Sequence, residues 1–557
     1  MKKIVLLLSF IIPFIGISQV VLKENLTPID KIFWDIKKTK IQSAGSYYKD
    51  LLGQTRDRHG KWEYFNEFGD LVEVRNFYRG KLHGQVFLKY ANGKPKQEGY
   101  FRMNVQDSVY REWIENGNLS IEGFYKKDKP FGIWKKFYIN SQSQSIEEYI
   151  DTVCYIKDFW MNDSLHSHVI KNGNGVKTLY FPNGRIKEIY NYKEGLRDGP
   201  CEDWSINGYL LLKGNFKQER KDGTWNFYYY TGELEKTSNY KNGLLEGAYV
   251  YYYDNKTINV SGNYHLGKKE GKWIWYNNQG IKDQEGTFIN DLQDGAWIYY
   301  YPTGQVSYNA FYKLGKKEGK WEYFYSNKQP FKIGTYKNDL KDGLWETWYE
   351  NGTLLMSGKY LQGKEQGVWS NYWENSKLKN QSTFKNGELN GKWNSWYPSG
   401  NIMLTGFYKQ NFKTKKWVRF MENGKLEEIT SYKISSKKLN NMNYGFWKNQ
   451  KIKESIRHGK YVTYSQKDFQ LTETGQYVND LKDGTWTAYL PGGKVPAFIT
   501  NYKKGELDGL MIEFGRGGEK ISETSYSKGI KNGKMKVFDK KGKVILEKEF
   551  NNGIEKR

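Results

Sequence analysis

The sequence predicts an all-β protein: an elongated repeat array of about 19 β-hairpins that form a single long twisted antiparallel meander. Three observations lead to this fold class. A glycine followed two residues later by tryptophan recurs every 24 residues over much of the chain. Between the turns, residues recur with the two-residue period of a strand. The composition combines 17% aromatic residues and 58 glycines with a mean hydropathy of −0.83, which suits many turns around a thin aromatic core.

Residues 294–319 contain one complete repeat and show its parts. Side chains of different character alternate over 297–301, and a tip turn follows at Thr303-Gly304. A return strand alternates over 306–312, and the chain reverses again over 315–319, where the next repeat starts. Each repeat is therefore expected to be strand, tip turn, strand and back turn, so that consecutive repeats continue one meander.

The glycine before the tryptophan, taken as position zero, falls into three blocks with a step of 24 residues, apart from two steps of 25 near the end. We divide the chain into a lead-in or cap at 19–55, repeats at 56–138, 171–426 and 457–557, and two register breaks at 139–170 and 427–456. Each break is either an insertion or a degenerate repeat, and offers a place for a joint or a binding loop. Position zero is occupied by Gly60, Gly84, Ser108, Gly132, Gly175, Gly199, Gly223, Gly247, Gly271, Gly295, Gly319, Gly343, Gly367, Gly391, Lys415, Gly459, Gly484, Gly509 and Gly533.

Several other repeat positions have a physical meaning. Tryptophan at position two predicts a ladder of rings, and the frequent glycine at position fifteen leaves room for that ring to lie across the backbone. Asn-Gly or a relative near position nine predicts a tight tip turn. Position seventeen is aromatic, and position twenty is Gly, Asn or Asp, which tolerate a left-handed backbone; only Glu219 departs from this in the central block. The structural repeat residues include Gly271, Gly295, Gly319, Gly343, Trp273, Trp297, Trp321, Trp345, Tyr264, Tyr312 and Tyr336.

The pattern Tyr-x-x-Gly-x-x-x-Gly-x-Trp, as over 264–273, resembles the MORN repeat (membrane occupation and recognition nexus), and in particular its bacterial variant, often found in antitoxin-like proteins. The resemblance covers about residues 55–553 apart from the two breaks. Standard MORN repeats have glycine where this chain has the ladder tryptophan, which points to the variant class. The resemblance implies an elongated single-sheet meander used for binding and assembly, and it brings no catalytic residues.

Residues 1–18 carry two lysines and then an apolar run that ends in small residues, which is typical of a secretory signal peptide. The apolar run, about 15 residues long, is shorter than the ~20 residues needed to span a bilayer. We therefore expect cleavage near Ser18 and a mature protein in the periplasm, at the cell surface or outside the cell.

No constellation of residues indicates catalysis, and we expect neither an enzyme nor a cofactor, metal or small-molecule substrate. The Lys-Asp-Gly and Lys-Lys-Glu-Gly runs recur between repeats, so we assign them to turn chemistry. His166 and His168 would share one face of a strand, but a third metal ligand is missing nearby in sequence. Cys154 and Cys201 lie far apart, and the sequence leaves open whether they pair.

The formal net charge is +25, and the lysines that produce it are spread through turns and outward strand positions. They either attract an acidic partner or keep neighbouring chains apart. We expect an exported, non-enzymatic scaffold that binds a protein or a glycan through an aromatic and basic surface, with Tyr276, Tyr300 and Tyr349 as candidate binding residues. The alternatives are peripheral association with an anionic membrane and, by family analogy, an antitoxin or immunity role. Export argues against a nucleic-acid partner.

Overall fold

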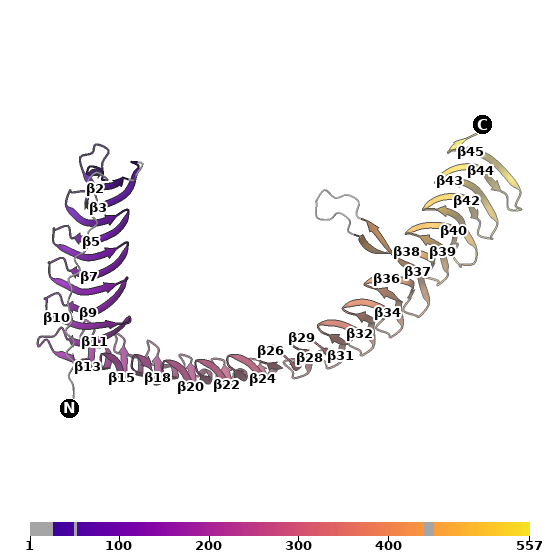
Figure 1. The fold of residues 1–557 in the computed structure, drawn as a ribbon. Coiled ribbons are helices and arrows are strands. Elements are labelled where there is room, and N and C mark those ends of the chain that lie inside the picture. The colour runs from indigo at the N-terminus through magenta and orange to yellow at the C-terminus, as the bar shows by residue number, and fades with distance from the viewer. Residues whose placement is uncertain (1–25, 50–52, 439–450, 557) are drawn as a thin grey trace, which may run out of the picture. The chain divides into compact units, whose positions relative to one another are not determined.

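The computed structural model describes residues 26–49, 53–438 and 451–556, and it confirms the predicted fold class. These residues form 46 strands and no helix, so nothing in this part of the chain is a helix that could cross a membrane. The chain divides into two compact units, Met1–Lys256 and Thr257–Arg557. Within each unit, consecutive strands pair antiparallel as an open meander of hairpins (Figure 1). The leader predicted at 1–18 lies outside the described residues.

The first unit contains twenty strands, in hairpins from β1 onwards. They are β1 Asp30–Phe33, β2 Ile41–Lys49, β3 Thr55–Phe65, β4 Leu71–Tyr78, β5 Lys81–Lys89, β6 Pro95–Arg102, β7 Val105–Trp113, β8 Leu119–Lys126, β9 Lys129–Phe137, β10 Ser143–Ile150, β11 Val153–Trp160, β12 His168–Lys171, β13 Asn174–Tyr180, β14 Ile186–Lys193, β15 Leu196–Trp204, β16 Leu210–Lys217, β17 Arg220–Lys221, β18 Gly223–Tyr228, β19 Leu234–Lys241 and β20 Leu244–Tyr252.

The second unit contains the remaining strands. They are β21 Ile258–His265, β22 Lys268–Tyr276, β23 Lys282–Ile289, β24 Leu292–Tyr300, β25 Val306–Lys313, β26 Lys316–Lys317, β27 Gly319–Phe324, β28 Pro330–Lys337, β29 Leu340–Lys341, β30 Gly343–Trp348, β31 Leu354–Leu361, β32 Lys364–Tyr372, β33 Leu378–Lys385, β34 Glu388–Trp396, β35 Ile402–Lys409, β36 Phe412–Phe420, β37 Leu426–Lys438, β38 Lys451–Tyr464, β39 Leu471–Val478, β40 Leu481–Tyr489, β41 Pro496–Lys503, β42 Glu506–Phe514, β43 Lys520–Ser527, β44 Ile530–Phe538, β45 Val544–Asn551 and β46 Ile554–Glu555.

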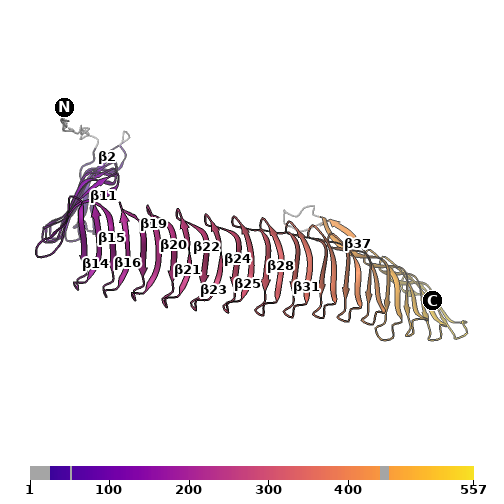
Figure 2. The ribbon, with the colours of Figure 1, turned by 90° about the horizontal axis from the view of Figure 1, so that it is seen from below.

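One hairpin of the second unit, β24–β25, shows how the tip of a repeat is built. The register shifts after Tyr299, so that Tyr300 lies opposite Val306. Gly304 closes the tip turn with a φ of 85°, a conformation that glycine adopts without steric cost. The turns of this unit gather along the two long edges of its sheet, tip turns on one edge and back turns on the other (Figure 2).

The back turns have the left-handed backbone that position twenty predicts. Gly315 has a φ of 82°, and Glu219, the exception in sequence, adopts 66°. The Gly315 N–H donates to the Gln293 carbonyl at 2.7 Å, and the Leu314 N–H donates to the Asp294 carboxylate at 2.9 Å. Each back turn is thereby tied to the one before it. The bond to Asp294 recurs in other repeats, where the side chain of the residue before position zero accepts a backbone N–H of the following back turn. These acceptors are Asp198, Asp222, Glu270, Glu318, Asp342, Gln366, Asp483, Asp508 and Asn532.

Position zero lies in a bulge. Between Glu285 and Thr287 the register shifts, so that Gly286 faces three residues of the next strand. The glycine at position zero has a positive φ in this bulge, and Ser108 and Lys415, which replace it in two repeats, adopt φ values of 75° and 62°. The bulge turns the following tryptophan onto the glycine of the neighbouring strand.

The tryptophans at position two form the predicted ladder, and they are the core of the sheet. The Trp297 ring is 1% exposed and donates its Nε1–H to the Thr287 carbonyl at 3.2 Å. A Cβ atom at Gly286 would overlap this ring, which confirms the space predicted at position fifteen. Trp393 differs, because Ser382 stands in place of that glycine and the ring is only half-buried. The buried ladder residues are Trp62, Trp134, Trp225, Trp273, Trp297, Trp321, Trp345, Trp369, Trp417 and Trp486.

The first register break, in the first unit, contains a shortened hairpin, β11–β12. In a regular repeat, position zero comes four residues after the glycine of the back turn, as Gly319 does after Gly315. Here Gly175 comes only two residues after Gly173, so the back turn is two residues shorter. The next back turn therefore reaches β11, where the Ile156 N–H donates to the Gly195 carbonyl at 2.9 Å. The run of strands in this unit changes direction at β11–β13, which we call the corner (Figure 1).

The second register break, in the second unit, contains the long hairpin β37–β38. These strands of 13 and 14 residues continue their pairing past the usual back turn, from Tyr432 and Arg457 to Lys438 and Lys451. The hairpin stands out from the sheet in Figure 1. The part of the predicted break at 439–450 lies outside the described residues.

Candidate binding surface

Among the described residues of each unit, no second layer of strands covers either face of the sheet, and the pairing register assigns each repeat position to one face. Side chains alternate along β24, so Trp297 and Tyr300 point to opposite faces. Trp297 pairs with Ala310, so positions two and fifteen share what we call the ladder face. Tyr300 pairs with Val306, so positions five and eleven share what we call the open face.

On the ladder face, a lysine two residues before position zero lies over the tryptophan ring. Lys269 Nζ is 4.8 Å from the centroid of the Trp273 ring. The Lys-Asp-Gly runs are therefore only partly turn chemistry: the acid and the glycine shape the turn, whereas the lysine covers the ladder. This cover, together with burial, leaves little of the tryptophan rings for a ligand. The same arrangement pairs Lys221 with Trp225, Lys317 with Trp321, Lys341 with Trp345, Lys413 with Trp417 and Lys482 with Trp486.

On the open face, rings at position five and aliphatic side chains at position eleven form a continuous row beside the tip turns. We call this row in the second unit the tip stripe. All of its members are half-buried, so each leaves part of its apolar surface in contact with water. In the sequence, the stripe corresponds to positions five and eleven of the 24-residue repeat. The predicted binding residues included rings at position five but no residue at position eleven. The tip stripe consists of Tyr300, Val306, Phe324, Pro330, Trp348, Leu354, Tyr372, Leu378, Trp396, Ile402, Phe420 and Leu426.

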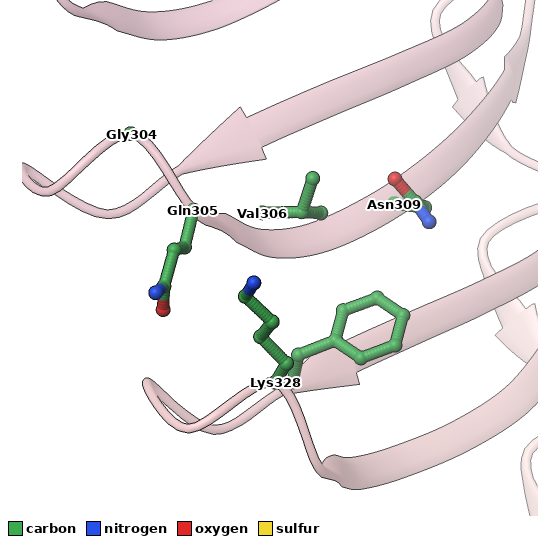
Figure 3. Close-up of a pocket in the computed structure, with 6 residues that line it drawn as sticks. Gly304, Gln305, Val306, Asn309 and Lys328 are labelled. Atoms are coloured by element: carbon green, nitrogen blue, oxygen red, sulfur yellow. The ribbon is translucent and has the colours of Figure 1, made fainter.

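A hollow of about 400 Å³ opens along the tip stripe between two neighbouring hairpins. Val306 and Phe324 supply its apolar walls, and Asn309 lies further along the strand. Gln305 and Lys328 face each other at its tip end (Figure 3). An apolar floor with a few polar groups at the rim is the usual make-up of a binding hollow.

Of the predicted binding residues, Tyr276 and Tyr300 lie at position five of their repeats and are half-buried. The Tyr300 hydroxyl donates to Glu285 at 2.6 Å, and the ammonium groups of Lys272 and Lys282 lie 2.8 Å and 3.0 Å from the same carboxylate. Burial acts to raise the pKa of Glu285, but these three donors outweigh it and hold that pKa at about 2. Burial and the Glu285 carboxylate raise the pKa of Tyr300 to about 12. A fixed polar network therefore lies on the open face beside Tyr300, the first ring of the tip stripe.

Tyr349 lies one position later than the other two and has a different environment. Its hydroxyl donates to the Tyr372 carbonyl of the next tip at 2.9 Å, so the ring ties neighbouring hairpins together. Its hydroxyl is used within the array, while the ring beside it, Trp348, belongs to the tip stripe. The same tie is made by Tyr90, Tyr138, Tyr229, Tyr301, Tyr325, Trp373 and Tyr397.

The back-turn edge of the second unit combines exposed leucines with lysines. Ion pairs among the described residues of this unit involve other lysines, such as Lys272 and Lys320 at position one. The acids of these turns accept backbone N–H groups and do not pair with these lysines. We call this set the leucine–lysine edge: Leu266, Leu292, Leu314, Leu340, Leu361, Lys313, Lys316, Lys337 and Lys364.

The histidines and cysteines near the corner serve packing within the first unit. His168 Nε2 lies 2.8 Å from Asp158, and its ring stacks on Trp160. No group of three His, Cys, Asp or Glu residues in the described part of the chain is placed to hold a metal ion. Cys154 and Cys201 are free thiols. Burial, followed by the nearby carboxylates, raises the pKa of both thiols to about 11, so both are protonated at neutral pH.

A known repeat family matches parts of the chain. The family described as MORN repeat variant matches nine segments of the chain, at residues 82–103, 106–127, 174–194, 221–242, 293–314, 317–338, 341–362, 365–386 and 389–410. No curated protein matches the chain.

Three solved structures illustrate how remote the structural likenesses are. A TcdB2-TccC3 protein without its hypervariable C-terminal region is 11% identical over 92% of this chain and 31% of its own, with a TM-score of 0.13. A Tc holotoxin pore from Photorhabdus luminescens is 8% identical over 92% of this chain and 33% of its own, with a TM-score of 0.13. Choline binding protein F from Streptococcus pneumoniae is 12% identical over 50% of this chain and 95% of its own, with a TM-score of 0.14. This chain thus spans about a third of the first two, and TM-scores this low carry no argument on its function.

Proposed function

The chain is a MORN repeat protein of the variant class, and from that premise we propose that it is a non-enzymatic scaffold that binds a partner protein through the tip stripe. One observation carries the proposal. The stripe continues from Tyr300 to Leu426 with one ring and one aliphatic side chain in every hairpin, each partly exposed. Apolar surface that continues over so many residues marks an interaction site on a soluble protein.

A protein partner suits the make-up of the stripe. Partly buried rings set among aliphatic side chains supply most of the binding energy in protein interfaces. Adjacent strands lie about 4.8 Å apart, so equivalent rings recur about every 10 Å. A partner can therefore engage several equivalent contacts at once, and its affinity rises through multivalency even when each contact is weak. We place the scaffold outside the cytoplasm on the strength of the leader predicted at 1–18.

The test is a capture experiment with cell-envelope extract and the purified chain, at low and high salt. The stripe variant carries Phe324→Thr, Trp348→Thr and Trp396→Thr, which keep strand propensity and remove the rings. The edge variant carries Leu292→Thr, Leu340→Thr and Leu361→Thr and serves as the matched control. We expect one recurrent protein whose affinity falls at least tenfold for the stripe variant, measured with that protein purified, and stays unchanged for the edge variant. Equal binding by both variants would contradict the proposal.

A second candidate function is peripheral association with an anionic membrane, which the leucine–lysine edge favours. Exposed leucines can enter the apolar boundary of a bilayer while neighbouring lysines pair with anionic head groups. Sedimentation with vesicles of phosphatidylcholine, with and without phosphatidylglycerol, tests it. Binding should need phosphatidylglycerol, weaken with salt, and be lost in the edge variant but kept in the stripe variant. Absent or salt-independent binding would rule it out.

A further inference from the structure

The corner of the first unit contains a hollow of about 640 Å³, which we call the corner pocket. Tyr155 of β11 overhangs it, Lys193 and Asp198 come from the back turn beside it, and Asn215 and Lys217 come from β16 and its turn. It exists because the shortened hairpin lets β11 approach the next back turn. A Cβ atom at Gly195 would lie 2.9 Å from the Tyr155 side chain, so only glycine permits this approach.

Two lysines in the lining of the corner pocket are available to bind an anion. Lys193 and Lys217 hold position eighteen in successive repeats, and both are exposed. In the described part of the chain neither is in an ion pair, whereas Lys177 on β13 and Lys213 on β16 are. Of the two acids in the lining, Asp198 already accepts the Gln218 N–H at 3.2 Å. The lining thus holds two ammonium groups outside any ion pair and two carboxylates, Glu194 and Asp198, of which Asp198 is held by that hydrogen bond.

The other lining groups favour a ligand rich in hydroxyl groups. The Asn215 amide donates to the Phe216 carbonyl, which leaves its side-chain oxygen as an acceptor. Glu194 adds a second acceptor, and the lysines add donors. The half-buried Tyr155 ring supplies one apolar wall, against which the C–H face of a sugar ring can lie.

We propose that the corner pocket binds one acidic sugar residue of a glycan. Lys193 and Lys217 hold its carboxylate, Asn215 and Glu194 accept its hydroxyl groups, and Tyr155 packs on its ring. A hollow of this size matches a small ligand. Regular repeats lack the overhanging strand, so the proposal gives one site per chain. It shares no residue with the tip stripe, which belongs to the other unit.

The experiment uses the full chain and oligomers of galacturonic, glucuronic and mannuronic acid, with galactose oligomers as the neutral comparison. Saturation-transfer NMR identifies binders, and calorimetry gives stoichiometry and affinity. We expect one-to-one binding of at least one acidic oligomer, at least tenfold tighter than the neutral one and weakened by salt. The double variant Lys193→Gln, Lys217→Gln should lose at least tenfold in affinity. Lys241→Gln, at position eighteen of the next repeat and away from the pocket, should change nothing.

Two further variants separate the site from folding and from the tip stripe. Tyr155→Phe keeps the ring and should keep the affinity, whereas Tyr155→Thr should lower it while the circular dichroism spectrum stays unchanged. The stripe variant should bind the sugar normally, so a failure of the protein-binding proposal leaves this result intact. Three results would overturn the sugar site: no acidic oligomer binds, the neutral oligomer binds as tightly, or the lysine double variant binds like Lys241→Gln.

Discussion

The indole ring of Trp297 lies across the backbone of Gly286 on the neighbouring strand, so close that a Cβ atom at Gly286 would overlap the ring where it now stands. The Trp297 N–H donates to the carbonyl of the next residue, Thr287. This contact recurs from one repeat to the next. The absence of a side chain at position fifteen of one strand thus sets where the tryptophan ring of the following strand lies. The array is thus held by nearest-neighbour contacts, as expected of a repeat protein.

Replacing Gly286 by serine should release Trp297. Ala310 shows that a methyl group alone is tolerated, because Trp321 beside it stays 3% exposed. Ser382 has a half-buried Trp393 beside it. We expect Gly286→Ser to shift tryptophan emission to longer wavelength and to lower local stability by about 1–2 kcal/mol in hydrogen exchange.

The reciprocal change, Ser382→Gly, is the control for that prediction. It should shift the emission of Trp393 to shorter wavelength, because the ring can then lie across the backbone. The gain in stability should stay below about 1 kcal/mol, since glycine in a strand has an entropic cost. Unchanged emission in both variants would show that the glycine does not position the ring.

Lys269 should stabilise the sheet through the ring of Trp273. Its Nζ lies 4.8 Å from the ring centroid, and a partly exposed contact of this kind contributes about 0.5–1 kcal/mol. Lys269→Gln should lower the denaturation midpoint accordingly, whereas Lys268→Gln, the exposed neighbour, should leave it unchanged. Equal effects of the two substitutions would assign the loss to net charge instead of the ring.

Asp294 should stabilise the back turn through the Leu314 N–H. Removing the acceptor in Asp294→Ala should cost about 1 kcal/mol, seen as faster exchange of the Leu314 amide. Asp294→Asn should be nearly neutral, because Gln366 and Asn532 accept the corresponding N–H groups in their own repeats. A large effect of the asparagine variant would mean that charge, and not the hydrogen bond, matters here.

Glu285 should make the second unit sensitive to acid. Its pKa is about 2 in the folded chain against an ordinary value of 4.5, so the folded state favours the ionised form. The stability that it contributes is complete above about pH 4.5 and is lost as the pH falls from there towards 2. Glu285→Gln should remove this part of the pH dependence.

Tyr300→Phe tests the cause of that shift. It removes one of the three donors to the carboxylate, so the pKa of Glu285 should rise and the loss of stability should begin at a higher pH. Carboxyl titration by NMR measures the pKa in each variant. An unchanged pKa would show that the two lysines alone set it.

The repeat and its turns followed from sequence because they depend on residues close together in the chain. Position twenty needs a left-handed backbone, and even Glu219 adopts one there, because the turn length leaves no other path. The residues of the candidate binding surface could be predicted from the sequence only in part. Tyr300 lies on the open face, whereas Tyr349, one residue further along its repeat, bonds to the next tip. The bulge at each tip changes the register there, and the pattern of residue types does not reveal it.

By itself, the sequence determined the 24-residue period, the two kinds of turn and the tryptophan that lies over glycine, since each depends on local backbone preference or on an adjacent strand. Only the tertiary structure decided which repeat positions share a face of the sheet and which lysines cover the tryptophan rings. It also decided that β11 reaches Gly195 at the corner. These features depend on bulges, which shift the pairing register within each repeat, and on the two residues missing before Gly175. A shift of one residue in pairing moves a side chain to the other face, so the surfaces available to a partner are set by register.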